Sequence, residues 1–169
     1  MSSKSSPEKL ITPENSSSKL LTLRNFTVLG DVFKETGKLR EAEDLYRSGL
    51  QGREKVLGCD HPETLTAAHN LSLILEAQRK FSDAEELFRS TIEARQRVFG
   101  KSHPATCSTA YCLGDMLRKL GRKAEAIEWV DFALQGYVEF LGEDHANTRL
   151  CRRVLKNLQS SSNPSCVVV

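Results

Sequence analysis

Apolar residues recur along the chain at spacings of three and four, which is the pattern of helices that bury one face. One such stripe runs through residues 39–57, and it returns 42 residues later through residues 81–99. A third copy keeps the same register through residues 123–141. The hydrophobic pattern therefore predicts three amphipathic helices over these ranges, related by an internal repeat.

A polar motif separates these stripes and repeats with them. A glycine is followed three residues later by a histidine, and three residues after that by a threonine; the copies are Gly58-His61-Thr64, Gly100-His103-Thr106 and Gly142-His145-Thr148. A fixed period of about 20 to 50 residues is the signature of a solenoid. Because one helix pair cannot bury its apolar face alone, we expect three complete units to stack, followed by a single last helix.

The segments that follow the polar motif predict the first helix of each unit. Capping side chains are expected at four equivalent places, Ser18, Asp60, Ser102 and Asp144. A glutamate three residues after Asp60 completes a capping-box pattern. These caps predict helices over 19–36, 62–78, 104–120 and 146–158. Gly37 and Gly121 are expected to end two of them, and Arg79 takes that place in the middle unit.

The composition disfavours several classes of function. The net charge is +2 and the acidic and basic residues are interleaved, which argues against nucleic-acid binding. The five cysteines form no Cys-x-x-Cys pair. No apolar run approaches the roughly 20 residues of a membrane span, and residues 1–18 lack the apolar core of a signal peptide. The expected location is the cytoplasm, with reduced thiols.

Metal binding and catalysis are disfavoured as well. His61, His103 and His145 hold identical places at helix starts, which favours capping and packing over metal ligation. No Gly-rich phosphate loop, nucleophile elbow or isolated carboxylate pair occurs in the sequence. Cys107 and Cys112 are expected to be buried as small hydrophobic residues. We therefore expect no enzyme, no cofactor and no metal site.

Two segments resemble a known family. Residues 57–65, Leu-Gly-Cys-Asp-His-Pro-Glu-Thr-Leu, and residues 81–88, Phe-Ser-Asp-Ala-Glu-Glu-Leu-Phe, closely resemble the long tetratricopeptide repeat (TPR) of kinesin light chains. Residues 99–106 and 141–148 are degenerate copies of the first segment. The resemblance covers about 16–158. It implies an all-α TPR superhelical solenoid of three helix-turn-helix repeats plus a C-terminal capping helix.

The domain boundaries follow from the repeat. The predicted TPR domain, 16–158, consists of repeats over 16–57, 58–99 and 100–141 and a capping helix over 142–158. A disordered Ser/Pro-rich N-terminus, 1–15, and a flexible tail, 159–169, are expected on either side.

The resemblance also implies a binding site, because in that family the first helices line a concave groove that holds an extended peptide. The equivalent residues are Arg24, Thr27, Asp31 and Lys34 in the first unit, Thr66, His69, Asn70, Leu73 and Glu76 in the second, and Ser108, Tyr111, Cys112, Asp115 and Arg118 in the third. Asn70 stands where the family places an asparagine that hydrogen-bonds a ligand backbone, since an amide both donates and accepts. The Lys/Asn/Arg cluster of chaperone-binding TPR proteins is matched only at Asn70.

The end of the chain carries a separate signal. Cys166-Val167-Val168-Val169 fits the Cys-aliphatic-aliphatic-X pattern of prenylation, although valine is not a preferred last residue. Prenylation of Cys166, removal of the three valines and methylation would tether the protein peripherally to a membrane. Stable attachment needs a second membrane-binding feature besides the lipid, and positive charge would supply it, from Arg149, Arg152, Arg153 and Lys156. An apolar tail with a free thiol is the alternative, and both stay open.

The sequence thus predicts an adaptor or scaffold that binds a partner peptide or helix in the concave groove, with or without a membrane tether. The alternative is a structural or assembly subunit of a larger complex, with its surfaces permanently buried. Purification behaviour distinguishes the two, because a buried subunit exposes apolar patches and aggregates alone.

Overall fold

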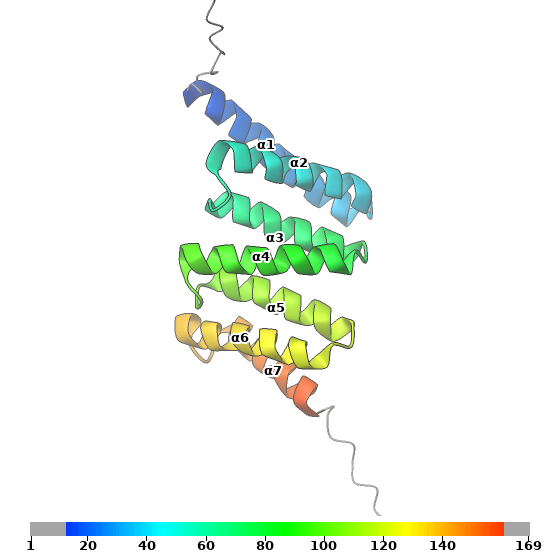
Figure 1. Ribbon diagram of the computed structural model, residues 1–169, viewed down its shortest axis with the longest axis vertical. Coiled ribbons are helices and arrows are strands. Elements are labelled where there is room, and N and C mark those ends of the chain that lie inside the picture. Colours follow the sequence, from blue (N-terminus) through cyan, green and yellow to red (C-terminus); the bar gives the residue numbers. More distant parts are fainter. Residues whose placement is uncertain (1–12, 161–169) are drawn as a thin grey trace, which may run out of the picture.

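The computed structural model describes residues 13–160 of the chain, and its side chains from Leu21 onward. This part contains no strand and seven helices: α1 Pro13–Glu35, α2 Leu39–Leu57, α3 Pro62–Ala77, α4 Phe81–Phe99, α5 Pro104–Lys119, α6 Lys123–Leu141 and α7 Ala146–Ser160. Figure 1 shows the helices stacked in sequence order along one axis. The predicted all-α solenoid is confirmed, and α2, α4 and α6 begin and end at the predicted residues. Cys166 lies outside the described residues.

The first helix begins earlier than predicted, at Pro13 instead of residue 19. A proline is tolerated in the first turn because the N–H that it lacks would have no partner in the helix. Ser18 therefore lies inside α1, so its prediction as a cap was wrong. Residues 13–15, predicted as part of the N-terminal segment, belong to α1, and residues 159–160, predicted as part of the flexible tail, belong to α7.

The later first helices are capped by histidines. Nδ1 of His61, His103 and His145 accepts a hydrogen bond from the backbone N–H two residues ahead, at 3.2 Å in each case. A proline follows His61 and His103 directly and occupies the first turn of α3 and α5. The capping role expected for the repeated histidine is confirmed.

The predicted caps one residue earlier were wrong. Asp60 accepts a hydrogen bond from Arg97 at 3.1 Å, and Ser102 donates one to Glu139. Asp144 is exposed and does not cap α7. The imidazole ring of the neighbouring histidine already supplies the acceptor, because in its neutral form one ring nitrogen carries a free lone pair.

The turns inside each unit depend on a left-handed residue at the end of the first helix. Gly37 and Gly121 have φ values of 76° and 77°, and Arg79 has φ 64° at the equivalent place. A glycine adopts this conformation without steric cost, whereas a residue with a Cβ atom does so at some strain. The three predicted left-handed positions are confirmed, and the helices before them end at Glu35, Ala77 and Lys119, one residue earlier than predicted.

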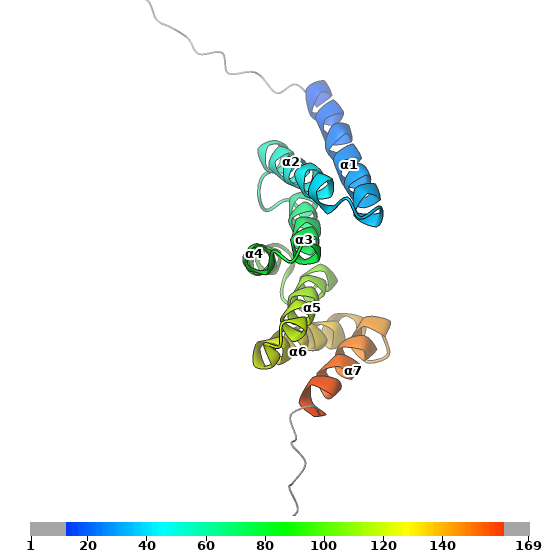
Figure 2. The same ribbon diagram turned by 90° about the vertical axis from the view of Figure 1, so that its right-hand side faces the viewer.

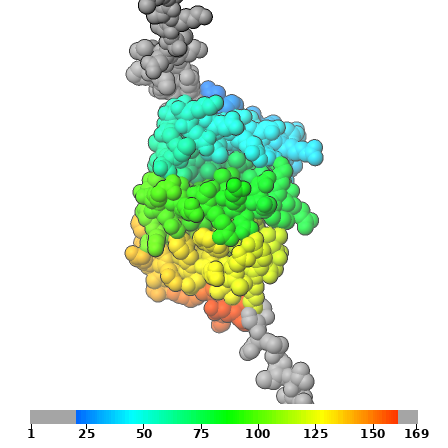
Figure 3. Space-filling view, in the orientation of Figure 1, coloured from blue at the N-terminus to red at the C-terminus, as the bar shows by residue number. Residues whose placement is uncertain are grey.

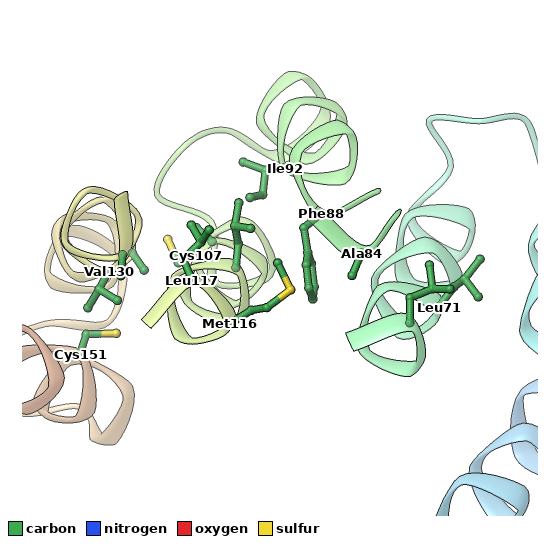
Figure 4. Close-up of a cluster of buried hydrophobic side chains, with 14 of the residues drawn as sticks. Leu71, Ala84, Phe88, Ile92, Cys107, Met116, Leu117, Val130 and Cys151 are labelled. Atoms are coloured by element: carbon green, nitrogen blue, oxygen red, sulfur yellow. The ribbon is translucent and has the colours of Figure 1, made fainter. Parts of the chain in front are cut away.

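The core is continuous from unit to unit. Ala42, Ala84 and Ala126 are fully buried at equivalent places in α2, α4 and α6, where a small side chain lets paired helices approach closely. Figure 4 shows Phe88 of α4 beside Met116 of α5. Both side chains are fully buried in the same cluster. Each helix packs mainly on its neighbours in sequence, as expected for a solenoid.

Ion pairs on the second helices repeat with the same period as the core. Lys80, at the turn before α4, lies with its Nζ 2.7 Å from Glu43 Oε2 on α2. Arg122, at the turn before α6, pairs in the same way with Glu85 on α4. The hydrogen bond from Arg122 holds the pKa of Glu85 below its usual value. These pairs join successive units at equivalent positions.

The helices form two rows, with the first helices of the units in one row and the second helices in the other. Figure 2 shows α4 end-on, lying to one side of α3 and α5. Figure 3 shows this row of second helices from outside, where α2, α4 and α6 form successive bands of one continuous surface. The first helices therefore line the other side, which is the side that holds the candidate site.

Candidate functional site

A cavity of about 420 Å³ opens between α1 and α3. Four of the predicted groove residues line it together: Arg24, Thr27, Thr66 and Asn70. The other lining residues are Val28, Arg53, Pro62, Glu63 and Ala67. The register of the repeat thus brings part of the predicted set to one place, and the wall combines charged, amide, hydroxyl and apolar groups.

The floor of this cavity includes an arginine that the sequence analysis did not select. Arg53 extends from α2 and is only 5% exposed. Its Nη2 donates hydrogen bonds to Leu23 O and Thr27 Oγ1, both at 3.0 Å. Burial lowers the pKa of Arg53, partly offset by the charge of Glu63. The guanidinium remains charged and therefore places a positive group beneath the cavity.

A second buried arginine holds the equivalent place in the next unit. Arg95 of α4 is 4% exposed. Its Nη1 donates to Ala105 O at 2.7 Å and to Thr109 Oγ1 at 2.6 Å, and its Nη2 donates to Leu65 O at 3.3 Å. Within the described residues, the buried Nε of Arg95 has no hydrogen-bond partner. The signal that could have identified both arginines is their 42-residue spacing inside otherwise apolar stripes.

His69, a predicted groove residue, is held against the core. Its Nδ1 lies 3.3 Å from Thr109 Oγ1 on α5, and its ring meets the ring of Phe88 edge-on at 6.1 Å. Burial, together with the positive charges of Arg95 and Lys34, lowers the pKa of His69 to about 4. A neutral imidazole therefore links α3 to α5 at neutral pH.

The depressed pKa of His69 predicts a specific loss of stability in mild acid. The unfolded chain binds a proton on His69 near pH 6.5, whereas the folded chain does so only near pH 4. The contribution of neutral His69 to the free energy of unfolding is thus complete above about pH 6.5, and it is lost as the pH falls toward 4. Urea unfolding should show that the wild type loses about 1–3 kcal/mol more than His69→Gln between pH 7.5 and pH 4.5. Parallel pH profiles for the two proteins would contradict this assignment.

The far end of α3 and α5 carries a cluster of ion pairs. Lys119 Nζ lies 2.9 Å from Glu76 Oε1 and 2.9 Å from Asp115 Oδ2, and Arg118 Nη2 lies 2.7 Å from Asp115 Oδ1. The three predicted residues of this cluster therefore neutralise one another with the help of Lys119, which the sequence analysis did not select. Exposed pairs of this kind contribute about 0–1 kcal/mol each.

The remaining predicted residues lie outside the cavity wall. Asp31 accepts a hydrogen bond from the hydroxyl of Tyr46, and Lys34 is exposed. Leu73, Tyr111 and Cys112 are half-buried against the core, and Ser108 is half-buried. The structure thus places four predicted side chains around one cavity and distributes the others along α1, α3 and α5.

The described residues contain no group of three or more His, Cys, Asp and Glu side chains that could hold a metal ion. No helix among them is long and apolar enough to cross a bilayer. Cys107 is buried and Cys112 half-buried, each as a free thiol, and burial raises the pKa of both to about 11. The four basic residues proposed as a membrane signal are exposed on α7: Arg149, Arg152, Arg153 and Lys156.

Several solved structures share this arrangement. Two crystal structures of the nearly identical TPR-like repeats of a protein described as a kinesin light chain from Podosopora anserina align with TM-scores of 0.72 and 0.73 at 20% identity. They cover 81% and 83% of this chain, which spans just under two thirds of theirs, 65% and 66%. The crystal structure of BtubC (BKLC) from P. vanneervenii aligns with a TM-score of 0.65 at 17% identity, over 89% of this chain and 70% of that one.

The family follows from a comparison that uses sequence. No curated protein matches the chain. The family model described as tetratricopeptide repeat matches residues 19–97 and 67–137, together more than half of the sequence. Repeats of this kind generally mediate protein–protein interactions. The seven helices, the 42-residue register and this match show that the chain belongs to the tetratricopeptide-repeat family, with repeats like those of kinesin light chains.

Proposed function

We propose that this protein is an adaptor that binds an extended peptide segment of a partner protein along α1, α3 and α5. The observation that supports this most directly is the side chain of Asn70. It lines the cavity between α1 and α3, is half-exposed, and makes no hydrogen bond within the described residues. An amide in this state can both donate to and accept from a peptide backbone.

The chemistry of the cavity suits a short peptide stretch of mixed character. Val28 and Ala67 offer apolar surface to a small side chain, and Arg24 and Glu63 offer charges of both signs. The buried guanidinium of Arg53 adds a fixed positive group below them. Contacts along the rest of the groove would come from half-buried side chains on α5, above all Tyr111.

Replacing Asn70 tests the proposal directly. If the amide hydrogen-bonds the ligand backbone, Asn70→Ala should weaken binding by about 1–3 kcal/mol, because partner groups are left buried and unpaired. The probe is a set of extended peptides selected on the immobilised wild type from a random library, with affinities measured by fluorescence anisotropy. The free energy of unfolding should barely change, because the amide has no hydrogen-bond partner to lose among residues 13–160.

The matched control is Asn147→Ala on α7, where an exposed asparagine lies far along the chain from the cavity. This variant should bind the selected peptides like the wild type. If binding survives both Asn70→Ala and Tyr111→Ala, the partner uses the opposite face or an edge of the solenoid, and the groove proposal fails.

Membrane tethering is a separate matter. Lipidation of Cys166 remains a prediction, because that residue lies outside the described part of the chain. Comparing the membrane fraction and the mass of the wild type and Cys166→Ser in cells tests it independently of peptide binding.

A further inference from the structure

One side of α1 carries an apolar stripe that the other described residues leave largely exposed. Leu21, Val28, Leu29 and Val32 are 61%, 63%, 45% and 48% exposed. At 100° per residue these four positions fall on one side of the helix, with Asn25 among them. Only three other large hydrophobic side chains in the described part are comparably exposed, and they are scattered: Val98, Leu120 and Phe140.

The repeat shows what this stripe is built to contact. Leu29 corresponds in register to Leu71 and Leu113, which are 3% and 0% exposed. Val32 corresponds in the same way to Ile74 and Met116, which are both fully buried. In those units the second helix of the preceding unit packs on the first helix, α2 on α3 and α4 on α5. At Leu29 and Val32, α1 therefore presents the face on which a further helix would pack.

The two ends of the solenoid differ in the polarity of their outer surfaces. The last helix, α7, presents a charged outer surface, with Arg149, Arg152, Arg153 and Lys156 exposed. Terminal repeats with a polar outer face keep a solenoid soluble and unassociated. The outer surface is polar at the α7 end and apolar at the α1 end. An interaction at the end of the stack is therefore expected at α1.

Residues 1–12 offer few apolar side chains that would match the stripe. Their large apolar residues are Met1, Leu10 and Ile11, and the last two lie within three residues of the start of α1. The others are Ser, Lys, Pro, Glu and Thr. The composition of this segment therefore favours a different occupant.

The charges beside the stripe point to a second copy of the chain. Arg24, Asp31 and Glu35 fall on one edge of the stripe at 100° per residue. In a two-fold antiparallel pair of α1 helices centred between Val28 and Leu29, the same edges meet. Arg24 of one copy then lies within about 3 Å along the axis of both Asp31 and Glu35 of the other. Neither Arg24 nor Glu35 makes an ion pair within the described residues of one chain.

We infer that two copies of this chain associate through their α1 helices, antiparallel, with the apolar stripes in contact and Arg24 facing the acidic residues of the other copy. Arg24 and Val28 also line the cavity between α1 and α3, whereas Val32 lies on the stripe and does not line it. Replacing Val32 therefore tests the inference separately from the proposed function.

Sedimentation equilibrium on the full chain tests the inference. The wild type should be a dimer that dissociates on dilution. Val32→Lys should raise the dimer dissociation constant about tenfold or more, because each copy buries a charge in the apolar contact. Val98→Lys is the matched control, since Val98 is 40% exposed at the end of α4, and it should leave the constant unchanged. Circular dichroism establishes that both variants are folded.

Charge reversal tests the antiparallel orientation. Arg24→Glu should weaken the dimer, and the double variant Arg24→Glu/Glu35→Arg should recover part of the loss, because the opposite charges then meet again across the two-fold axis. A wild type that stays monomeric at every concentration overturns the inference. So does an equal effect of Val32→Lys and Val98→Lys, or a dimer that forms only when residues 1–12 are removed.

Discussion

Phe88→Ala is expected to lower the free energy of unfolding by about 3–5 kcal/mol. Phe88 is fully buried in α4, which packs on both α3 and α5. Its ring touches that of His69, and Figure 4 shows it beside Met116. Removing the ring leaves a cavity in the middle unit, where both neighbouring units depend on the same side chain. In a solenoid such a loss affects two unit interfaces at once.

Urea unfolding followed by circular dichroism measures this change. The matched control is Phe140→Ala, because Phe140 is 57% exposed and makes mainly an edge-on contact with His103 at 5.7 Å between ring centres. This control should cost less than about 1 kcal/mol. Similar losses for the two variants would show that α4 does not pack as described.

Gly136→Val is expected to cost about 3 kcal/mol, the upper end of the range for overpacking. A Cβ atom on Gly136 of α6 would overlap Sγ of Cys107, and it would lie 3.2 Å from Cα of Ser102 and 3.3 Å from O of Lys101. Two of these neighbours are backbone atoms at the start of the last complete unit. They cannot rotate away as a side chain can, so α5 and α6 would have to separate.

The control lies at the equivalent position of the first unit. Gly52 packs on Leu23 where Gly136 packs on Cys107, and the three atoms nearest to a Cβ atom there all belong to the flexible side chain of Leu23. Gly52→Val should therefore cost at least about 1 kcal/mol less than Gly136→Val in the same urea experiment. The middle unit supports this expected order of costs, because it already has a Cβ atom at this place. Ala94 and Leu65 occupy the positions that Gly52 and Leu23 hold in the first unit. A larger cost at Gly52 would contradict the assigned packing.

The sequence by itself determined the architecture, because each helix and turn pattern occurs in three copies at the same spacing. The 42-residue register predicted α2, α4 and α6 to the residue, and it marked the left-handed positions at Gly37, Arg79 and Gly121. These features can be predicted without the tertiary structure, because they depend on residues that are near one another in the chain. They are the hydrophobic period, the turn conformation and the small residues at close contacts. The caps lie one residue later than predicted, because a histidine ring nitrogen supplies the acceptor in place of the aspartate or serine before it.

Only the tertiary structure decided which polar side chains are available. The sequence placed His69 and Glu76 in the groove as equals of Asn70, but His69 is held against Thr109 and Phe88, and Glu76 is paired with Lys119. Arg53 reaches the cavity from a second helix, which register alone does not show. These contacts join residues 19 to 43 positions apart. These contacts form only when the units stack, because stacking sets how closely the helices pack. It also decides which polar groups are buried and therefore need a hydrogen-bond partner.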